Sequence, residues 1–429
     1  MIGSALLALG LVLTTASQLR LPGVPLGFGE VCLVLWLGLA LLHVLTRDSI
    51  SNPGALLRLG TFWICFALSL GVGICQALLR EELDPGSMLH DAFAYLLVAA
   101  VSCFIVATMK ADGTLRQSQW FLIAFWIIAL VVQIAMGWRF IRLPSVDPWF
   151  WARFRGWSEN PNQLALYCAL LAALSLHLAL SAKGFGRLAA SFSCLLSLVV
   201  GRLTKSDTFL GAMVLCTAVF LVLRLRSWLT LPEHRFSLRF AVAMFIVIAI
   251  VPLSLSLTPY AVATADDVES LAASLTKDRG GEATMRTASL RLYLWQNALK
   301  NGLESGSLGL GPGPHLWRAK VQAAMAADNR STTLPFEAHN TALDVFTQGG
   351  LLGVMAVYGL LAGIFLLVLR AKLDALAIFM VALAIFSMTH FVPRQPIVWF
   401  ALALSLILGL ERPRRRARAL GPEPCVEYP

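Results

Sequence analysis

One histidine stands where an imidazole could act on a hydroxyl group. His339 lies in the stretch 336–340, which follows a long polar segment and precedes a long apolar run. An imidazole can accept a proton near neutral pH, so this position suits a base that acts on a membrane-bound acceptor. Asn340 or Glu337 could orient the ring. On local sequence alone, an ordinary helix-entry histidine is the simpler interpretation, and both interpretations stay open.

Basic side chains form the second pattern of possible chemistry. They lie at the ends of apolar runs or in polar loops, and a guanidinium fork pairs well with phosphate oxygens. Together they could hold a lipid pyrophosphate at headgroup depth. For any single arginine, ion pairing or snorkelling to the interface is the simpler explanation. The candidates are Arg155, Arg202, Lys205, Arg286, Arg291 and Arg394.

Other motifs argue against nucleotide or metal chemistry. The glycine-rich stretch 309–314 is not followed by Gly-Lys-Ser/Thr, and its glycines lack dinucleotide-fold spacing, so we interpret it as an irregular loop. The chain has neither an HExxH motif nor a cysteine–histidine zinc pattern. The pair Asp266-Asp267 is more typical of solvated carboxylates. We therefore predict no metal, no cofactor and no nucleic-acid partner.

The elements that must position these residues are membrane helices. Of the 429 residues, 58% are hydrophobic and 14% are charged, whereas soluble domains carry about 25% charged residues. Continuous apolar runs of about 20 residues match the hydrocarbon thickness of a bilayer. Because helices satisfy their own backbone groups in lipid, we predict an all-α integral membrane protein.

Twelve predicted spans put both chain termini on one side of the membrane. That side carries most of the loop lysines and arginines and the arginines of the tail, so we place it in the cytoplasm. The tenth run is long enough to tilt, kink or project from the membrane. The predicted spans are 4–19, 27–46, 57–79, 90–109, 117–137, 162–182, 186–203, 207–225, 238–257, 339–369, 373–391 and 394–411.

Two outer loops interrupt this pattern. One, at about 138–161, is dense in aromatic residues and arginine. The other is the longest polar segment, and within it 286–300 has helical periodicity, with Leu290, Leu294 or Tyr293, and Asn297 on one stripe. We predict that this helix stops at 301–302. The predicted organisation is helices over 1–257, a large outer loop over 258–338, helices over 339–411 and a basic cytoplasmic tail over 412–429.

Three stretches carry the motifs of one known family. Residues 155–162 read Arg-Gly-Trp-Ser-Glu-Asn-Pro-Asn, and 289–291 read Ser-Leu-Arg, with Trp295 one turn later. His339-Asn340 is followed by Gly-Gly-Leu-Leu-Gly at 349–353. With the twelve-span layout and one large late loop, these stretches resemble the O-antigen ligase family of bacterial inner membranes, which is related to O-antigen polymerases.

One motif departs from that family. The family often has Thr-x-Ser-Arg-Gly at the start of a middle span, whereas 204–208 here read Thr-Lys-Ser-Asp-Thr. An aspartate thus stands where arginine is usual. Arg202 or Lys205 would supply the missing charge.

The resemblance implies a GT-C-like, metal-independent glycosyltransferase on the periplasmic face of the bacterial inner membrane. Its donor would be a glycan on undecaprenyl pyrophosphate. Its acceptor would be a sugar hydroxyl of lipid A–core, so that transfer completes lipopolysaccharide. His339 would act as a base or orient that hydroxyl, with Asn340, Asn160 and Asn162 in support. The cations that would stabilise the leaving pyrophosphate are Arg155, Arg202, Lys205, Arg286 and Arg291.

Other functions remain open at this stage. An O-antigen polymerase or a protein O-oligosaccharyltransferase would use the same donor with a different acceptor. A flippase or secondary transporter also has about twelve spans, but the sequence lacks the related halves and charged midplane helices that are typical of transporters. A noncatalytic membrane scaffold would use the outer loop to bind a partner.

Overall fold

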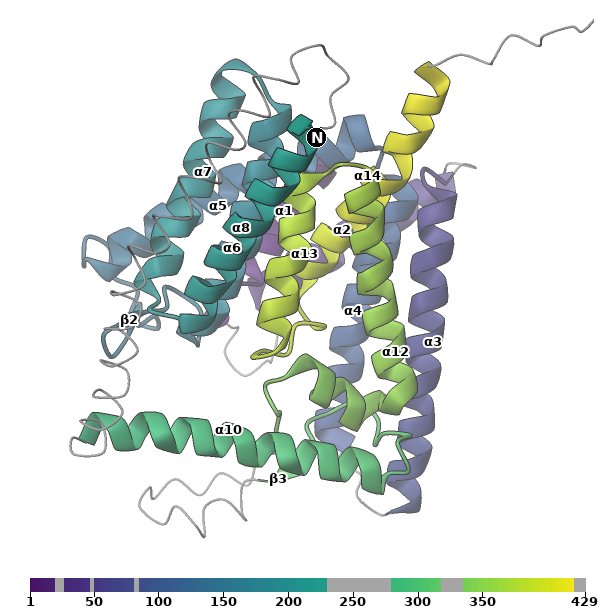
Figure 1. The fold of residues 1–429 in the computed structure, drawn as a ribbon, viewed down its shortest axis with the longest axis vertical. Coiled ribbons are helices and arrows are strands. Elements are labelled where there is room, and N and C mark those ends of the chain that lie inside the picture. The colour runs from purple at the N-terminus through teal and green to yellow at the C-terminus, as the bar shows by residue number, and fades with distance from the viewer. Residues whose placement is uncertain (20–26, 47–49, 81–84, 230–278, 318–334, 420–429) are drawn as a thin grey trace, which may run out of the picture.

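The chain forms a bundle of long apolar helices that one transverse helix crosses at one end (Figure 1). This computed structural model describes residues 1–19, 27–46, 50–80, 85–229, 279–317 and 335–419. The helices are α1 (Ile2–Leu13), α2 (Phe28–Thr46), α3 (Pro53–Leu79), α4 (Pro85–Thr108), a π-helical turn η1 (Ala111–Leu115), α5 (Arg116–Gly137), α6 (Pro161–Ser181), α7 (Gly184–Leu203), α8 (Asp207–Leu229), α10 (Arg279–Glu304), α12 (Thr341–Arg370), α13 (Asp374–Ser387) and α14 (Pro396–Ala419).

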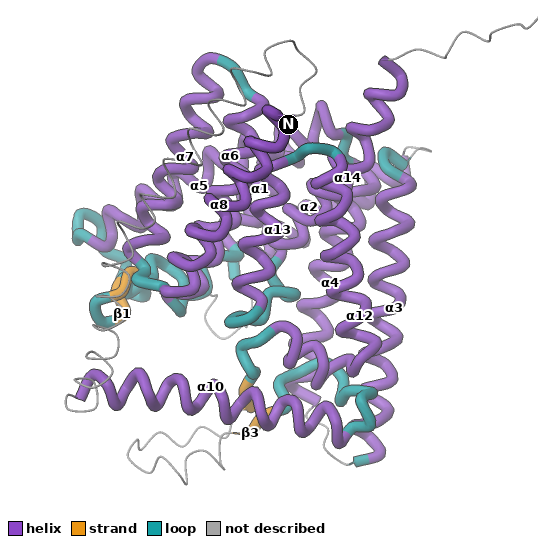
Figure 2. The backbone as a smooth tube through the Cα atoms, in the orientation of Figure 1, coloured by secondary structure: helices purple, strands orange, loops and turns teal. Residues whose placement is uncertain are grey.

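Strands are confined to two short antiparallel pairs in the described chain (Figure 2). In the first, β1 (Trp149–Phe150) pairs with β2 (Arg153–Phe154). In the second, β3 (Leu316–Trp317) pairs with β4 (Pro335–Phe336). Both pairs belong to loops at the end of the bundle where α10 lies, so they shape that surface and form no sheet core.

Among the described residues, eight helical segments are long and apolar enough to cross a bilayer, which supports the prediction of an all-α multi-pass membrane protein. They are α2, α3, α4, η1 with α5, α6, α7, α8 and α12. The apolar helices α1 and α13, and the part of α14 over Pro396–Glu411, are shorter. The predicted span 238–257 lies outside the described residues, so the count of twelve stays a prediction.

The start of the first helix and the end of the last described helix lie on the same side of the bundle. The start of α1 and the last turns of α14 lie at one end of the bundle, and α10 crosses the opposite end (Figures 1 and 2). The side of the membrane that each end faces stays a prediction.

Helix α6 is the most enclosed of these segments and lies at the centre of one half of the bundle. Its Leu- and Ala-rich faces pack mainly against α7 and α13. Since lipid gives no hydrophobic drive between helices, small residues and buried hydrogen bonds must join them. The Ser175 hydroxyl bonds the Ser193 hydroxyl at 2.9 Å, and the Trp126 indole N–H donates to the Ser197 hydroxyl at 2.9 Å. These contacts join α6 and α5 to α7.

Helix α10 confirms the helix predicted over 286–300, but it is longer at both ends. The predicted stop at 301–302 is wrong, because the helix continues to Glu304. Gly302 serves close packing instead, since a Cβ there would collide with the ring of Phe346. The buried stripe of α10 contains Leu294 and Ala298, which pack with Ala338 before α12.

Helix α12 breaks at Gly350, so of the alternatives open for the tenth run the structure shows a kink. Gly350 has φ +62° and ψ −160°, a backbone conformation that only glycine adopts readily. The irregular loop before it supplies the missing backbone partners. Leu351 N–H donates to the Ser307 carbonyl at 2.9 Å, and Gly311 N–H donates to the Gln348 carbonyl at 2.8 Å. The glycine-rich stretch therefore supports the break in α12.

Candidate functional site

The first turn of α12 is held by two side chains that cap it in opposite directions. The Asn340 side-chain oxygen accepts from the backbone N–H groups of Ala342 at 3.0 Å and Leu343 at 3.2 Å. The Asp344 carboxylate reaches back to the N–H groups of Ala338 at 2.6 Å and Asn340 at 3.1 Å. Because these donors have no partner within the helix, the reciprocal caps fix both the turn and the chain leading into it.

His339 is presented by that fixed turn. Its φ is +52°, in the left-handed region that few residues other than glycine adopt, although histidine does so more often than most. Asp344 holds the backbone N–H groups on either side of it. The His339 residue is exposed. A strained backbone that its surroundings hold in place is typical of a functional position.

The α13–α14 loop, residues 388–395, packs against the start of α12. The Thr341 hydroxyl donates to the His390 carbonyl at 2.6 Å and accepts from Val392 N–H at 3.2 Å. The Asn340 amide donates to the Met388 carbonyl at 3.2 Å. The cap of α12 and the loop therefore form one unit.

The same loop reaches two further helices. The Tyr167 hydroxyl of α6 donates to the Gln395 side-chain oxygen at 2.6 Å. The hydroxyls of Thr208, in the first turn of α8, and Thr389 lie 3.4 Å apart. The α13–α14 loop thus connects the start of α12 to the bundle core and to the α7–α8 turn.

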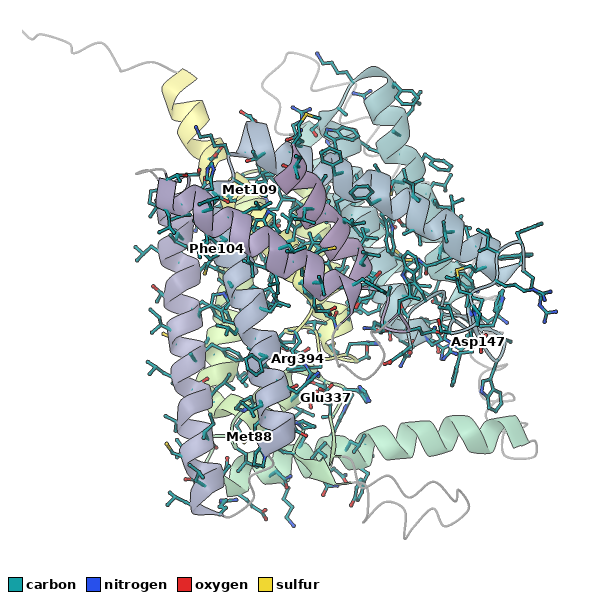
Figure 3. All side chains as sticks on the ribbon, turned by 180° about the vertical axis from the view of Figure 1, so that it is seen from behind. Met88, Phe104, Met109, Asp147, Glu337 and Arg394 are labelled. Carbon is teal, nitrogen blue, oxygen red and sulfur yellow. The ribbon has the colours of Figure 1, made fainter. Side chains whose placement is uncertain are left out.

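Arg394 of this loop bridges two carboxylates from different parts of the chain. Its guanidinium contacts Asp91 of α4 and Glu337 just before α12. It also lies over the Phe391 ring, 4.8 Å from the centroid. The Asp91 side chain is 1% exposed. Figure 3 shows Arg394 and Glu337 close together above α10. Arg394, a candidate phosphate ligand from sequence, is therefore already paired with acids.

Asp91 is a residue of the candidate site that was not selected from the sequence. One of its oxygens also lies 3.1 Å from His90 Nδ1. Its other oxygen is buried and has no hydrogen-bond partner among the described residues. One turn further along α4, the Tyr95 hydroxyl donates to the Gln348 side chain at 2.5 Å. An acidic residue within an apolar run is the sequence signal that indicates such a position.

A second group of predicted residues surrounds the start of α6. Asn160 caps this helix, because its side-chain oxygen accepts from Asn162 N–H at 2.9 Å. The Asn162 side-chain oxygen accepts from the Arg153 guanidinium at 2.6 Å. Arg153 also donates to the Thr204 carbonyl at 3.0 Å. Arg153, which sequence reasoning did not select, thus joins the α6 cap to the α7–α8 turn.

Arg155 stabilises its own loop. Its guanidinium donates to the Asp147 carbonyl at 2.9 Å and pairs with the Asp147 carboxylate at 3.2 Å. It also donates to the Glu159 carbonyl at 3.2 Å and lies 5.4 Å from the Phe150 ring centroid. These contacts occupy much of its hydrogen-bonding capacity, which weakens the case for Arg155 as a phosphate ligand.

Arg202 and Lys205 differ from Arg155. Arg202 lies in the last turn of α7 and Lys205 follows in the turn to α8, where it has φ +50°. Both are exposed. Within the part of the chain that the structure describes, neither side chain makes a hydrogen bond or an ion pair. Both cations are thus available to an anion at this end of the bundle.

Arg286 and Arg291 lie on α10, and their side chains are outside the described structure. The backbone places Arg291 one turn before Trp295, whose indole N–H donates to the Ala338 carbonyl at 3.1 Å.

The predicted residues therefore form two groups at the same end of the bundle. His339 and Asn340 lie at the start of α12. The other group comprises Asn160, Asn162, Arg155 and the α7–α8 turn. Figure 3 shows Asp147, which pairs with Arg155, well to one side of Arg394 and Glu337. The ribbon of α10 extends across both regions (Figure 1).

The residues near the site do not gather as metal ligands. Among the described residues, no group of three or more His, Cys, Asp or Glu side chains is arranged to hold a metal ion. The prediction of metal independence is not tested by this arrangement and stays a prediction.

One family model matches this part of the chain. Residues 190–358 match the family model Wzy_C, described as O-antigen ligase. The match spans most of α7, all of α8 and α10, and more than half of α12, so it contains Arg202, Lys205 and His339. No curated protein matches the chain. The family match confirms the resemblance predicted from the sequence motifs.

Proposed function

We propose, from the premise that the chain carries an O-antigen ligase domain, that it transfers a lipid-linked glycan to a hydroxyl of a second membrane-bound molecule. A ligase- or polymerase-like function is what the family indicates. In our proposal the donor is a glycan on undecaprenyl pyrophosphate and the acceptor is lipid A–core. The reaction takes place at the α10 end of the bundle, on the periplasmic face of the bacterial inner membrane.

The reaction forms one bond and breaks one. The acceptor oxygen attacks the anomeric carbon of the donor sugar, and the bond from that carbon to the pyrophosphate oxygen breaks. The electron pair leaves with the pyrophosphate, and the proton of the acceptor hydroxyl passes to the His339 imidazole. Asn340 supports His339 by fixing the turn that carries it. Such a leaving group needs charge stabilisation rather than a proton.

Cations provide that stabilisation in our proposal. Arg202 and Lys205 are exposed and make no polar contact within the described protein, so they can pair with phosphate oxygens without losing an internal partner. Arg286 and Arg291 would add charge from α10. Arg155 acts indirectly by ordering its loop, and Asn160 and Asn162 hold the start of α6 beside the α7–α8 turn.

The observation that carries this proposal is the presentation of His339. The family match includes this residue, its backbone is held in a strained conformation by two caps, and it is exposed. Its turn is also linked through the α13–α14 loop to the first turn of α8. An exposed imidazole, at the same end of the bundle as the available cations, fits transfer from a phosphorylated donor.

The test is transfer by the purified chain in lipid nanodiscs. Undecaprenyl-pyrophosphate glycan and lipid A–core are supplied in excess chelator, and the products are resolved by gel and mass spectrometry. We expect glycan on lipid A–core without added metal. Transfer that appears only after metal is restored would contradict metal independence, and no transfer in either condition would contradict the ligase assignment.

The same experiment separates the ligase from a polymerase. The second arm omits lipid A–core and supplies only single repeat units on the lipid carrier. A polymerase would lengthen these units, whereas the proposed ligase would leave them unchanged. A third arm with a protein acceptor tests for a protein O-oligosaccharyltransferase.

A further inference from the structure

We propose that Arg394 is a positioning residue, whose bridge between Asp91 and Glu337 sets where His339 is presented. This inference rests on the proposed function of His339. Arg394 and Asp91 both lie outside the residues that match the family model. The inference therefore depends on the contacts of this chain alone.

The bridge joins a rigid helix to the turn that carries His339. Asp91 lies in the second turn of α4, and its carboxylate is almost completely buried. Glu337 lies two residues before His339. Because Arg394 contacts both carboxylates, it fixes the distance between α4 and the chain that enters α12. The backbone between Glu337 and His339 is too short to absorb a shift at the bridge.

The caps carry this restraint to His339. The N–H of Ala338 is bound by Asp344, so a change in the path of Glu337 must move either this hydrogen bond or His339. The left-handed backbone of His339 gives it little freedom to compensate. A small displacement of a reacting group can lower a rate about a hundredfold.

The surroundings of Arg394 do not suit a pyrophosphate ligand. Two carboxylates contact its one guanidinium, so the local charge does not attract an anion. The Phe391 ring covers one face of the guanidinium. In contrast, Arg202 and Lys205 are exposed and unpaired within the described structure. The geometry thus distinguishes Arg394, which positions the chain before His339, from Arg202 and Lys205, which can bind phosphate.

The test uses variants that keep the size of each side chain and compares them with a matched pair elsewhere. Glu337→Gln removes one charge from the bridge, and Arg394→Lys keeps the charge but loses the fork that spans both acids. The control is Arg224→Gln, which breaks an ion pair with Asp374 at 3.5 Å between the last turns of α8 and the start of α13.

In the transfer assay we expect Glu337→Gln and Arg394→Lys to lower kcat about tenfold or more through misplacement of the imidazole, with both KM values within about twofold. Arg224→Gln should match the unmodified chain. In a His339→Ala background, Glu337→Gln should lower the rate no further. Unchanged kcat in both bridge variants, a raised donor KM at unchanged kcat, or a full additional loss in the His339→Ala background would overturn the proposal.

A second measurement does not need the transfer reaction. Diethyl pyrocarbonate modifies exposed imidazoles, and peptide mass spectrometry gives the rate at His339. We expect this rate to change in Glu337→Gln and Arg394→Lys and to stay unchanged in Arg224→Gln. If the unmodified chain transfers no glycan while this rate still responds, the proposed function fails and the positioning role stands. If the rate does not respond, the positioning role is wrong whatever the assay shows.

Discussion

Two regions at the α10 end of the bundle use polar side chains in opposite ways. At the start of α12, nearly every polar group has an internal partner: Asp344 binds two backbone N–H groups, and Arg394 bridges Asp91 and Glu337. At the α7–α8 turn, Arg202 and Lys205 are exposed, and their side chains have no polar partner in the described structure.

The difference suits two separate roles, proton transfer at the start of α12 and phosphate binding at the α7–α8 turn. A group that moves a proton must be held within a narrow geometry, so its supports are satisfied before substrate arrives. A group that binds a phosphate gains most when it gives up no internal contact on binding. We therefore expect changes at the start of α12 to lower kcat and changes at the α7–α8 turn to raise KM for the donor.

The largest effect should follow from Gly350→Ala, which tests whether the α12 region depends on its break. A Cβ at Gly350 would collide with the Ser307 carbonyl oxygen, at a φ that alanine disfavours. We expect no folded protein by size-exclusion chromatography and no transfer. The matched control is Gly359→Ala in the same helix, where a Cβ would meet open space. Normal folding of Gly350→Ala would show that α12 does not need the break at residue 350 or its contact with the Ser307 loop.

His339→Ala should preserve the fold and remove the chemistry. We expect the rate to fall about 10²- to 10⁴-fold, the usual contribution of a general base, at normal protein level and with unchanged KM values. The lipopolysaccharide of cells that carry only this variant should lack its ladder. His43→Ala, in α2 at the opposite end of the bundle, is the control. A normal ladder with His339→Ala would defeat the catalytic assignment.

The double variant Arg202→Ala with Lys205→Ala tests whether the α7–α8 turn binds the donor. Loss of a charge-assisted hydrogen bond is equivalent to about tenfold to a hundredfold in affinity, so donor KM should rise while the melting temperature stays unchanged. Lys183→Ala, an exposed lysine just before α7, is the control. If kcat fell at constant KM, the two regions would not divide binding from proton transfer as we propose.

The smallest effect should come from Asn160→Ala. Loss of an N-cap costs about 1 kcal/mol, and we expect a lower melting temperature with transfer within about twofold. Asn160→Asp keeps the capping oxygen and should restore the melting temperature. A large fall in transfer at unchanged melting temperature would instead indicate that Asn160 touches substrate.

The sequence predicted the elements better than their contacts. Apolar runs of bilayer length and the periodicity of 286–300 do not depend on distant residues. The membrane helices and the helix of the outer loop could therefore be predicted from the sequence. The end of α10 was misplaced because Gly302 resembles a stop signal, although its role is to admit the Phe346 ring.

The candidate site was only partly predictable for a related reason. His339 and Asn340 were selected because they adjoin one another. Arg394, Asp91 and Glu337 meet only after four helices pack, and each one alone resembles an ordinary interfacial charge. No spacing along the chain indicates that contact. Arg153 was passed over because it lies just before the motif that begins at Arg155, and its contacts with Asn162 and Thr204 depend on the fold.

The break in α12 also bears on how deep the start of this helix would lie in a membrane. The segment 351–370 after Gly350 is about 30 Å long at 1.5 Å per residue, which is about the thickness of the hydrocarbon layer. The short segment before the break is then left beyond the acyl chains. In the proposed mechanism, the break at Gly350 would therefore place the His339 imidazole at the depth of the phosphates and sugars of the two lipid substrates.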